Sequence, residues 1–378
     1  MTSSVHHHHR FRSERMASLN LQVRITSTLF LGVLLNGVSG AVVPFVFGDS
    51  LTEVGNNNFL QYSLAKSNYP WYGIDYKNGR PTGRFSNGRT IGDVIFSKLG
   101  VSSPPPYLSL LPLSTNDAFL QGVNYASGGA GILNETGIYF IEKLSFDDQI
   151  GCFEKTKKAI IEKIGEEASS KLIQAAVFYV GLGSNDYINN FLQPFLPDGQ
   201  QYTHEEFLDL IASTLEGQLK RLHGLGVRNI VFNGLGPLGC IPSQRVKSRN
   251  GTCLNNVNQW VVDFNSRVKT LLVSLNSSLP SAHFGFADSY HIVMDLIKRP
   301  QNYGLKVGNA SCCNVDKKLG GLCLPNSNLC SNRSEYVFWD AFHPSDAANV
   351  VIADIMISSD SGFMPASLPG FSKNESIW

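Results

Sequence analysis

The sequence lacks an excess of charge of either sign. Its 31 Lys and Arg residues almost balance its 30 Asp and Glu residues, so the formal net charge at pH 7 is +1. Proteins that bind nucleic acids usually carry a basic excess, and the composition therefore argues against a nucleic-acid partner. The chain also has no internal repeat, and with 43% hydrophobic residues among 378 it has ample apolar material for a core.

Long apolar runs are missing beyond the amino-terminal segment. No uncharged run after residue 41 is both long enough and free enough of Gly and Pro to cross a bilayer. In the amino-terminal segment, a second methionine, Met16, is followed by Arg24, an apolar run over 25–35 and small residues over 37–41. This is the order of a secretory signal peptide, so we predict an extension and signal over residues 1–40 and a secreted mature protein. A retained membrane anchor is the alternative.

The cysteines lack the C-x2-C repeats of a zinc site. There are seven, and four of them fall in one short stretch, at positions 312, 313, 323 and 330. In an oxidising compartment such a cluster predicts disulfide bonds, and we expect no metal. Cys240 and Cys253 are expected to close a second small loop. Because seven is an odd number, one thiol should stay free, with Cys152 as the first candidate.

Apolar runs alternate with amphipathic stretches along the rest of the chain. We predict strands at 42–47, 122–126, 175–180, 229–233 and 283–287, and helices that include 205–222 and 256–275, where apolar residues recur three and four apart. This alternation predicts a parallel sheet covered by helices on both faces.

The first predicted strand ends in Gly48, Asp49 and Ser50, before a polar turn rich in Asn. Open α/β sheets place their ligand sites at the carboxyl ends of strands, so the Ser50 hydroxyl is a candidate nucleophile. Serine needs a neighbouring base and oxyanion donors to act in this way. Taken alone, a serine that caps a turn is the simpler interpretation.

A candidate base lies near the carboxyl end, in the stretch YVFWDAFHPSD. Asp340 and His343 are three residues apart, so on one turn both side chains can face the same way. The carboxylate can then hold one imidazole nitrogen and leave the other free to accept a proton. Pro344 restricts the backbone of His343 to extended conformations.

Two further stretches could supply oxyanion donors. GVNYASGGAGI, residues 122–132, lets backbone N–H groups approach a ligand, and Asn185 follows the apolar strand that precedes GLGSNDY. The glycine spacing is not that of a GxGxxG dinucleotide loop, so no cofactor is expected. A tight turn and a helix cap are the alternative roles of these two stretches.

The order of these four stretches resembles that of the SGNH hydrolases. The segments FGDSL, GVNYASGGAG, GSNDY, GLGPLGC and FWDAFHP are similar to the plant GDSL esterase/lipase family, over about Phe45 to Met364. The resemblance implies a three-layer α/β/α sandwich, like flavodoxin, with a mainly parallel five-stranded sheet. It also implies the following roles: Ser50 as nucleophile, Asp340 and His343 as the rest of a triad, and Ser50, Gly129 and Asn185 as the oxyanion hole. Gly128 is the alternative to Gly129, and the chain departs from the family at Thr52 and Glu53, which carry no catalytic role in it.

A serine and a histidine at opposite ends of the mature chain must meet for proton transfer, so residues 41–378 are predicted to form one hydrolase domain. We expect a secreted esterase or lipase of the apoplast or cell wall that acts on small-molecule, lipid or polysaccharide esters. An acyltransferase and a catalytically silent binding protein are the alternatives. Six Asn-X-Ser/Thr sequons are possible N-glycan sites, at Asn134, Asn250, Asn276, Asn309, Asn332 and Asn374.

Overall fold

A five-stranded parallel sheet forms the centre of the fold. The computed structural model describes residues 42–317 and 321–358, so the predicted signal peptide and Asn374 lie outside the described residues. The strands are β1 (Pro44–Gly48), β2 (Val123–Asn124), β3 (Val177–Gly181), β4 (Asn229–Asn233) and β5 (His283–Ala287), in the order β2-β1-β3-β4-β5. All five residues of β1 and of β4 are buried, as expected for strands covered on both faces.

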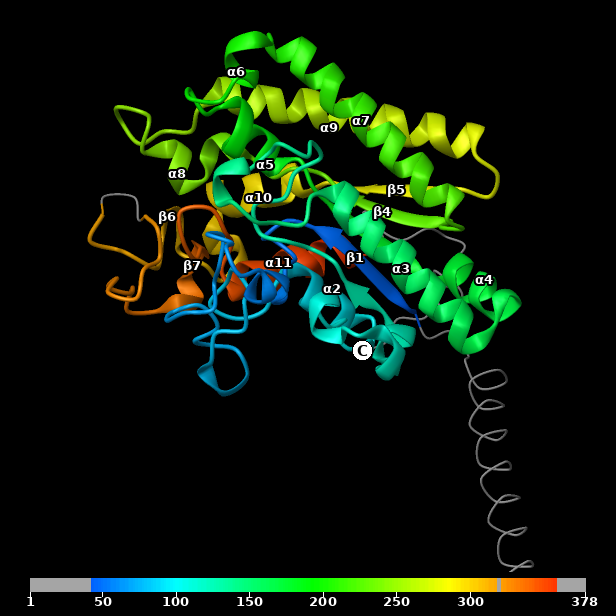
Figure 1. Cartoon of the computed structure of the whole chain (residues 1–378). Coiled ribbons are helices and arrows are strands. Elements are labelled where there is room, and N and C mark those ends of the chain that lie inside the picture. The colour runs from blue at the N-terminus through cyan, green and yellow to red at the C-terminus, as the bar shows by residue number, and fades with distance from the viewer. Residues whose placement is uncertain (1–41, 318–320, 359–378) are drawn as a thin grey trace, which may run out of the picture. The chain divides into compact units, whose positions relative to one another are not determined.

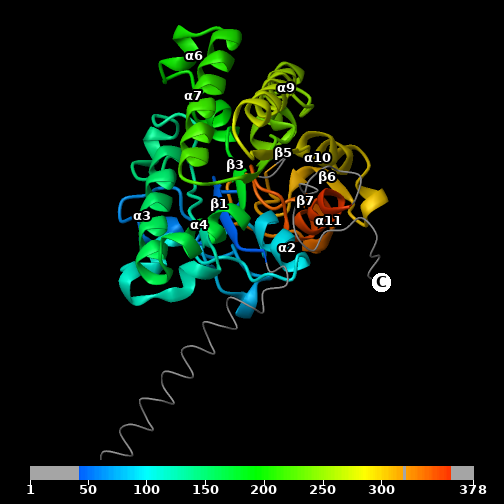
Figure 2. The same cartoon turned by 90° about the vertical axis from the view of Figure 1, so that its right-hand side faces the viewer.

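Helices cover both faces of this sheet (Figures 1 and 2). On one face lie α3 (Phe146–Ile164), α7 (His204–Gly224) and α9 (Asn255–Ser278), with α4 (Glu166–Ala175) packed against α3. On the other face α2 (Ile91–Lys98) packs against α11 (Asp346–Ile357), which also contacts α10 (Ser289–Lys298). Three short helices complete the set, α5 (Ser184–Asp186), α6 (Asp198–Gln201) and α8 (Pro242–Arg245). The predicted three-layer α/β/α fold is confirmed.

Local sequence explains where the long helices begin. The Thr203 side chain accepts from the backbone of Glu206 while the Glu206 carboxylate accepts from the backbone of Thr203, which is the capping box of α7. Ser145 and Asp148 form the same arrangement at the start of α3. Each box satisfies backbone N–H groups that have no partner within the helix, and the apolar side of each helix then packs on the sheet.

The strand order reverses direction at β1. The chain leaves β1 toward β2 on one side, crosses back to β3 on the other side and continues outward to β4 and β5. In open α/β sheets the crevice at such a reversal, outside the carboxyl ends of the strands, is the usual ligand site. Ser50 follows β1 and Asn185 follows β3, so the topology places both beside this crevice.

A second, two-stranded parallel sheet was not predicted. It consists of β6 (Val307–Ser311) and β7 (Tyr336–Phe338), which enclose the cysteine-rich loop. Disulfides join Cys312 to Cys330 and Cys313 to Cys323, and a third joins Cys240 to Cys253. The expected disulfides and the expected free Cys152 are confirmed. Because β7 leads directly to Asp340, this small sheet carries the predicted acid.

Candidate active site

The turn after β1 holds Ser50 at the end of the central sheet. The side chain of Gln149 accepts from the Gly48 N–H and donates to the Gly48 carbonyl, both at 2.9 Å. The Leu51 N–H then donates to the Asp49 carboxyl at 2.9 Å. A Cβ atom on Gly48 would lie 2.2 Å from the Thr52 hydroxyl, so only glycine fits here. These contacts fix the backbone on both sides of Ser50.

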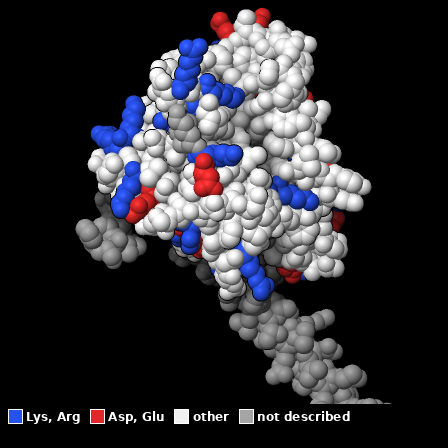
Figure 3. Space-filling model, turned by 90° about the vertical axis from the view of Figure 1, so that its left-hand side faces the viewer, with Lys and Arg blue, Asp and Glu red and all other residues white. Residues whose placement is uncertain are grey.

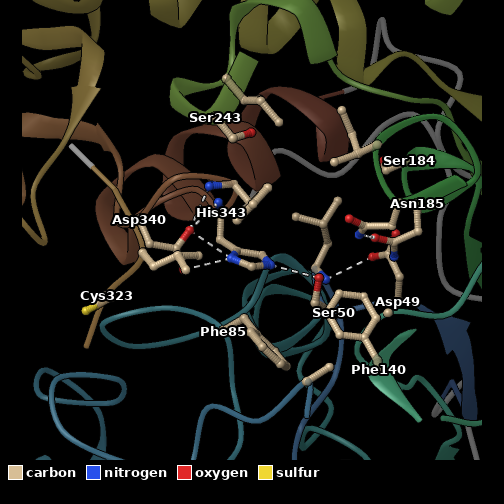
Figure 4. A pocket seen from close by; sticks show the side chains of 18 of the residues that line it. Asp49, Ser50, Phe85, Phe140, Ser184, Asn185, Ser243, Cys323, Asp340 and His343 are labelled. Carbon is tan, nitrogen blue, oxygen red and sulfur yellow. Dashed lines mark hydrogen bonds and ion pairs between the residues drawn. The ribbon is translucent and has the colours of Figure 1, made fainter. Parts of the chain in front are cut away.

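Ser50, His343 and Asp340 form one hydrogen-bonded line, although Ser50 and His343 are 293 residues apart (Figure 4). His343 Nε2 lies 2.8 Å from Ser50 Oγ, and His343 Nδ1 lies 2.9 and 2.8 Å from the two carboxylate oxygens of Asp340. An Nδ1–H that donates to Asp340 leaves Nε2 unprotonated, so the Ser50 hydroxyl donates to it. The line can therefore pass the Ser50 proton to the imidazole.

Asp340 is held as a carboxylate. It is 1% exposed, and although burial raises its pKa, the charge and hydrogen bond of His343 and further hydrogen bonds from Tyr72 and the Phe342 N–H lower it, so that the net shift is downward. The His343 N–H also donates to it, at 2.8 Å. An ionised Asp340 can stabilise the imidazolium that forms when His343 takes a proton.

Three residues with N–H donors, Ser50, Gly129 and Asn185, line the same cleft. The backbone N–H groups of Ser50 and Gly129 have no hydrogen-bond acceptor among the described residues, and both residues line the cleft with Asn185. The Asn185 amide gives one N–H to the Ala130 carbonyl at 2.8 Å and has a second left over. Gly128 is different, because its N–H donates to Glu53 at 2.5 Å. Of the two candidate glycines, Gly129 is the one with a free donor.

The conformation of Gly129 also depends on its lacking a side chain. Its φ angle is +84°, and a Cβ atom would lie 2.5 Å from the Phe140 ring. The turn therefore requires glycine at this position.

A chain of hydrogen-bonded polar side chains that was not predicted from the sequence lies behind Asn185. Tyr139 donates to Asn189, and Asn189 donates to the Asn185 side-chain oxygen, each at 2.5 Å. This chain fixes the orientation of the Asn185 carboxamide, because its oxygen accepts from Asn189 and its nitrogen donates to the Ala130 carbonyl. Asn189 lies in a π-helical turn, Tyr187–Phe191, a feature that is frequent at functional sites. The i, i+4 spacing of Asn185 and Asn189 was the available signal.

Tyr72 was also left out of the predicted site. Its hydroxyl donates to Asp340 at 2.6 Å, and its side chain is 5% exposed. Tyr72 lies in the aromatic insertion YPWYG, together with Tyr69, which lines the cleft. No sequence signal links Tyr72 to Asp340, because the two residues are 268 positions apart.

The buried carboxyl of Glu53 holds the turn that contains Gly128 and Gly129. Its carboxyl is 0% exposed and accepts from the N–H groups of Asn57 at 2.6 Å and Gly128 at 2.5 Å. Burial raises the Glu53 pKa to about 8, against the lowering effect of those two N–H groups. The departure from the family pattern at this position thus bears on the loop that presents Gly129.

A cleft of about 610 Å³ is lined by Ser50, Tyr72, Gly129, Asn185, Asp340 and His343. It also includes apolar side chains such as Leu64, Ile188, Phe342 and Leu322. Figure 3 shows the face that carries α8 and the β6–β7 sheet, on which Lys and Arg are scattered rather than gathered in one patch. Among residues 42–317 and 321–358, no helix is long and apolar enough to cross a membrane, and no cluster of His, Cys, Asp and Glu could hold a metal ion.

Comparison with known proteins decides the family. Residues 45–356 match the model of the GDSL-like lipase/acylhydrolase family. The chain belongs to this family. A GDSL esterase/lipase of Arabidopsis thaliana is 63% identical to this GDSL protein over 321 residues, which cover 85% of this chain and 90% of the relative. A second Arabidopsis GDSL esterase/lipase is 45% identical over 349 residues, covering 90% and 95%. The resemblance is confirmed, and so is the class of enzyme, a serine carboxylic-ester hydrolase.

Proposed function

We propose that this protein is a secreted serine esterase or lipase that works through an acyl-enzyme on Ser50. The observation that carries the proposal is the 2.8 Å contact of Ser50 Oγ with His343 Nε2, in line with Asp340. His343 takes the Ser50 proton as Oγ attacks the ester carbonyl carbon. The oxygen that becomes negative accepts from the N–H groups of Ser50 and Gly129 and from the Asn185 amide.

The tetrahedral intermediate then collapses. The bond between the carbonyl carbon and the alcohol oxygen breaks, and His343 gives its proton to the leaving alcohol. His343 next removes a proton from water, whose oxygen attacks the acyl carbon, and Ser50 leaves with that proton restored. Asp340 stays ionised and stabilises the imidazolium in both halves of the cycle.

Labelling by a fluorophosphonate probe tests the nucleophile directly. We expect the wild-type protein to be labelled at Ser50 and to hydrolyse p-nitrophenyl esters, and we expect Ser50→Ala to lose both properties. Ser213→Ala is a matched control, because Ser213 is exposed on α7 and bonds only to its own helix. Labelling that persists in Ser50→Ala would point to another nucleophile and contradict the proposal.

We also propose that residues 41–378 form one hydrolase domain and that the mature protein is exported to the apoplast or cell wall. Three disulfides support an oxidising destination. The side chains at five sequons, Asn134, Asn250, Asn276, Asn309 and Asn332, are exposed, which an N-glycan requires. Two of these amides already make hydrogen bonds: the Asn276 amide bonds the Phe284 backbone in both directions, and the Asn332 amide donates to Glu335 and accepts from Ser334. Glycosidase digestion of secreted protein, followed by peptide mapping, tests these sites.

A further inference from the structure

The short helix α8 forms part of the cleft wall beside His343. It contributes Ser243 and Gln244 to the cleft lining. The Ser243 N–H donates to the carbonyl of Ala341 at 2.9 Å, so α8 is attached to the segment between Asp340 and His343. Figure 4 shows Ser243 near His343, on the side of the cleft away from Asn185. This wall therefore lies on the imidazole side of Ser50 and not on the oxyanion side.

The polar atoms of these two side chains have no partners in the part of the chain that the structure describes. Gln244 is 2% exposed, yet its side-chain oxygen is enclosed without a hydrogen bond and its amide nitrogen donates to none of the described residues. The Ser243 hydroxyl is also enclosed without a partner. A buried polar atom without a partner is costly, so native proteins rarely keep one unless it serves a function.

Two other buried glutamines use their carboxamides, Gln149 at both ends and Gln218 through its nitrogen alone, with its oxygen unpaired. Gln149 is 0% exposed, and both ends of its carboxamide are used, by the N–H and the carbonyl of Gly48. The carboxamide of Gln244 thus differs from that of Gln149 in having no partner among residues 42–317 and 321–358. Because Gln244 lines the cleft, a group that occupies the cleft can supply such a partner.

The proposed reaction decides which part of a substrate meets α8. The ester carbonyl oxygen must face the N–H groups of Ser50 and Gly129, and the alcohol oxygen must lie near His343 Nε2 to receive its proton. The alcohol part of the ester then extends along the wall that contains Ser243 and Gln244. Phe342 and Leu322 line the same cleft and can cover its carbon atoms.

We propose that Ser243 and Gln244 form a polar subsite for the alcohol part of the ester, and that the enzyme prefers esters of polyols over esters of simple alkanols. A second hydroxyl close to the ester oxygen would bond the Gln244 carboxamide and the Ser243 hydroxyl after small side-chain rotations. A site built to bond a hydroxyl discriminates against an analogue that lacks it, because its polar groups then stay unpaired. The inference rests on the proposed function, since only the acyl-enzyme pathway places the alcohol on this side.

A matched pair of substrates tests the preference. A glycerol monoester and a propyl ester of the same acid share the acyl group and the three-carbon alcohol and differ only in two hydroxyls. The acid is the one whose p-nitrophenyl ester is hydrolysed fastest. We expect kcat/KM to favour the glycerol ester by roughly 10-fold in the wild type, and we expect Gln244→Met to reduce that ratio by roughly 3- to 10-fold, the value of one neutral hydrogen bond. Ser243→Ala should reduce it to a similar extent.

The control is Gln259→Met, the same exchange at an exposed position of α9, which should keep the wild-type ratio. The melting temperature of Gln244→Met separates binding from structure. Because the carboxamide makes no hydrogen bond to any described residue, Tm should stay the same or rise, whereas a structural glutamine would lower it. A lowered Tm with an unchanged ratio overturns the subsite.

Failure of the subsite is distinct from failure of the proposed function. If the wild type is labelled at Ser50 and hydrolyses both esters equally well, the preference for polyols is wrong and the esterase mechanism stands. If the wild type is neither labelled nor active on any ester, both are wrong.

Discussion

The buried carboxyl of Glu53 should make the protein less stable as the pH rises. In the folded protein burial raises the Glu53 pKa from 4.5 to about 8. Between those values the folded state keeps a proton on Glu53 that the unfolded state has released, so the free energy of unfolding falls as pH increases. The slope approaches 1.4 kcal/mol per pH unit for one such group. From pH 5 to pH 7, Glu53 alone should therefore cost about 3 kcal/mol.

Urea unfolding of the disulfide-intact protein at pH 5 and pH 7 measures this cost, with Glu53→Gln as the perturbation. Asp49 and Asp186, whose pKa values burial raises to about 7 and about 6, act in the same direction. His204, whose pKa burial lowers, acts in the opposite direction. The wild type and Glu53→Gln share these contributions, so they cancel when the pH dependence of the two free energies of unfolding is compared. The loss of stability between the two pH values should be smaller in Glu53→Gln by about 3 kcal/mol.

The Glu53→Gln exchange also removes one hydrogen-bond acceptor, because the NH2 group of the new side chain cannot accept from the N–H of Asn57 or Gly128. Glu53→Gln should therefore be less stable at pH 5, and only its pH dependence tests the pKa. Glu162→Gln, at an exposed position of α3, should keep the wild-type pH dependence. Parallel curves for wild type and Glu53→Gln would refute the reasoning.

Four other predictions concern the site and the disulfides. Asn185→Ala should fold normally and lower kcat on a p-nitrophenyl ester by about 10²- to 10³-fold, so wild-type turnover would rule out its role as a donor. Asn189→Leu should lower kcat by roughly tenfold with little change in KM, because it releases the Asn185 amide without removing it. Tyr72→Phe removes a hydrogen bond to Asp340, so kcat/KM should fall by about tenfold. Because that hydrogen bond lowers the pKa of Asp340, activity should begin to fall at a higher pH on acidification, and an unchanged pH profile would contradict this. Reducing the disulfides should lower the free energy of unfolding by roughly 2–5 kcal/mol for each bond, as measured by urea unfolding with and without reductant.

The central sheet was predictable because its strands are short, apolar and separated by helical stretches. All five predicted strands overlap observed ones, and the parallel pairing follows from the helical connections. The β6–β7 sheet was not predictable in the same way. The sequence of β6, VGNAS, has no apolar alternation, and β7 has only three residues. These strands are held by the surrounding disulfides and by packing rather than by their own pattern.

The predicted site residues share a motif order that sequence can reveal. His343 lies within hydrogen-bonding distance of both Ser50 and Asp340, as the order implied, while the catalytic roles of the three residues stay predictions. The contacts that support them were not visible in the sequence. Tyr72 reaches Asp340 from an insertion 268 residues away, and such a contact depends on how two loops pack and not on any local spacing.

Because Ser50 and His343 are 293 positions apart, the proposed hydrolysis requires synthesis of the chain at least as far as His343. A ribosome makes the strand that carries Ser50 early and the segment between β7 and α11 at the end of the described region. Under the proposed mechanism, a nascent or truncated polypeptide that lacks this last segment has Ser50 without the base that accepts its proton. A deletion anywhere from Tyr336 onward that removes His343 should therefore yield a product that does not hydrolyse esters, even when the five-stranded sheet forms.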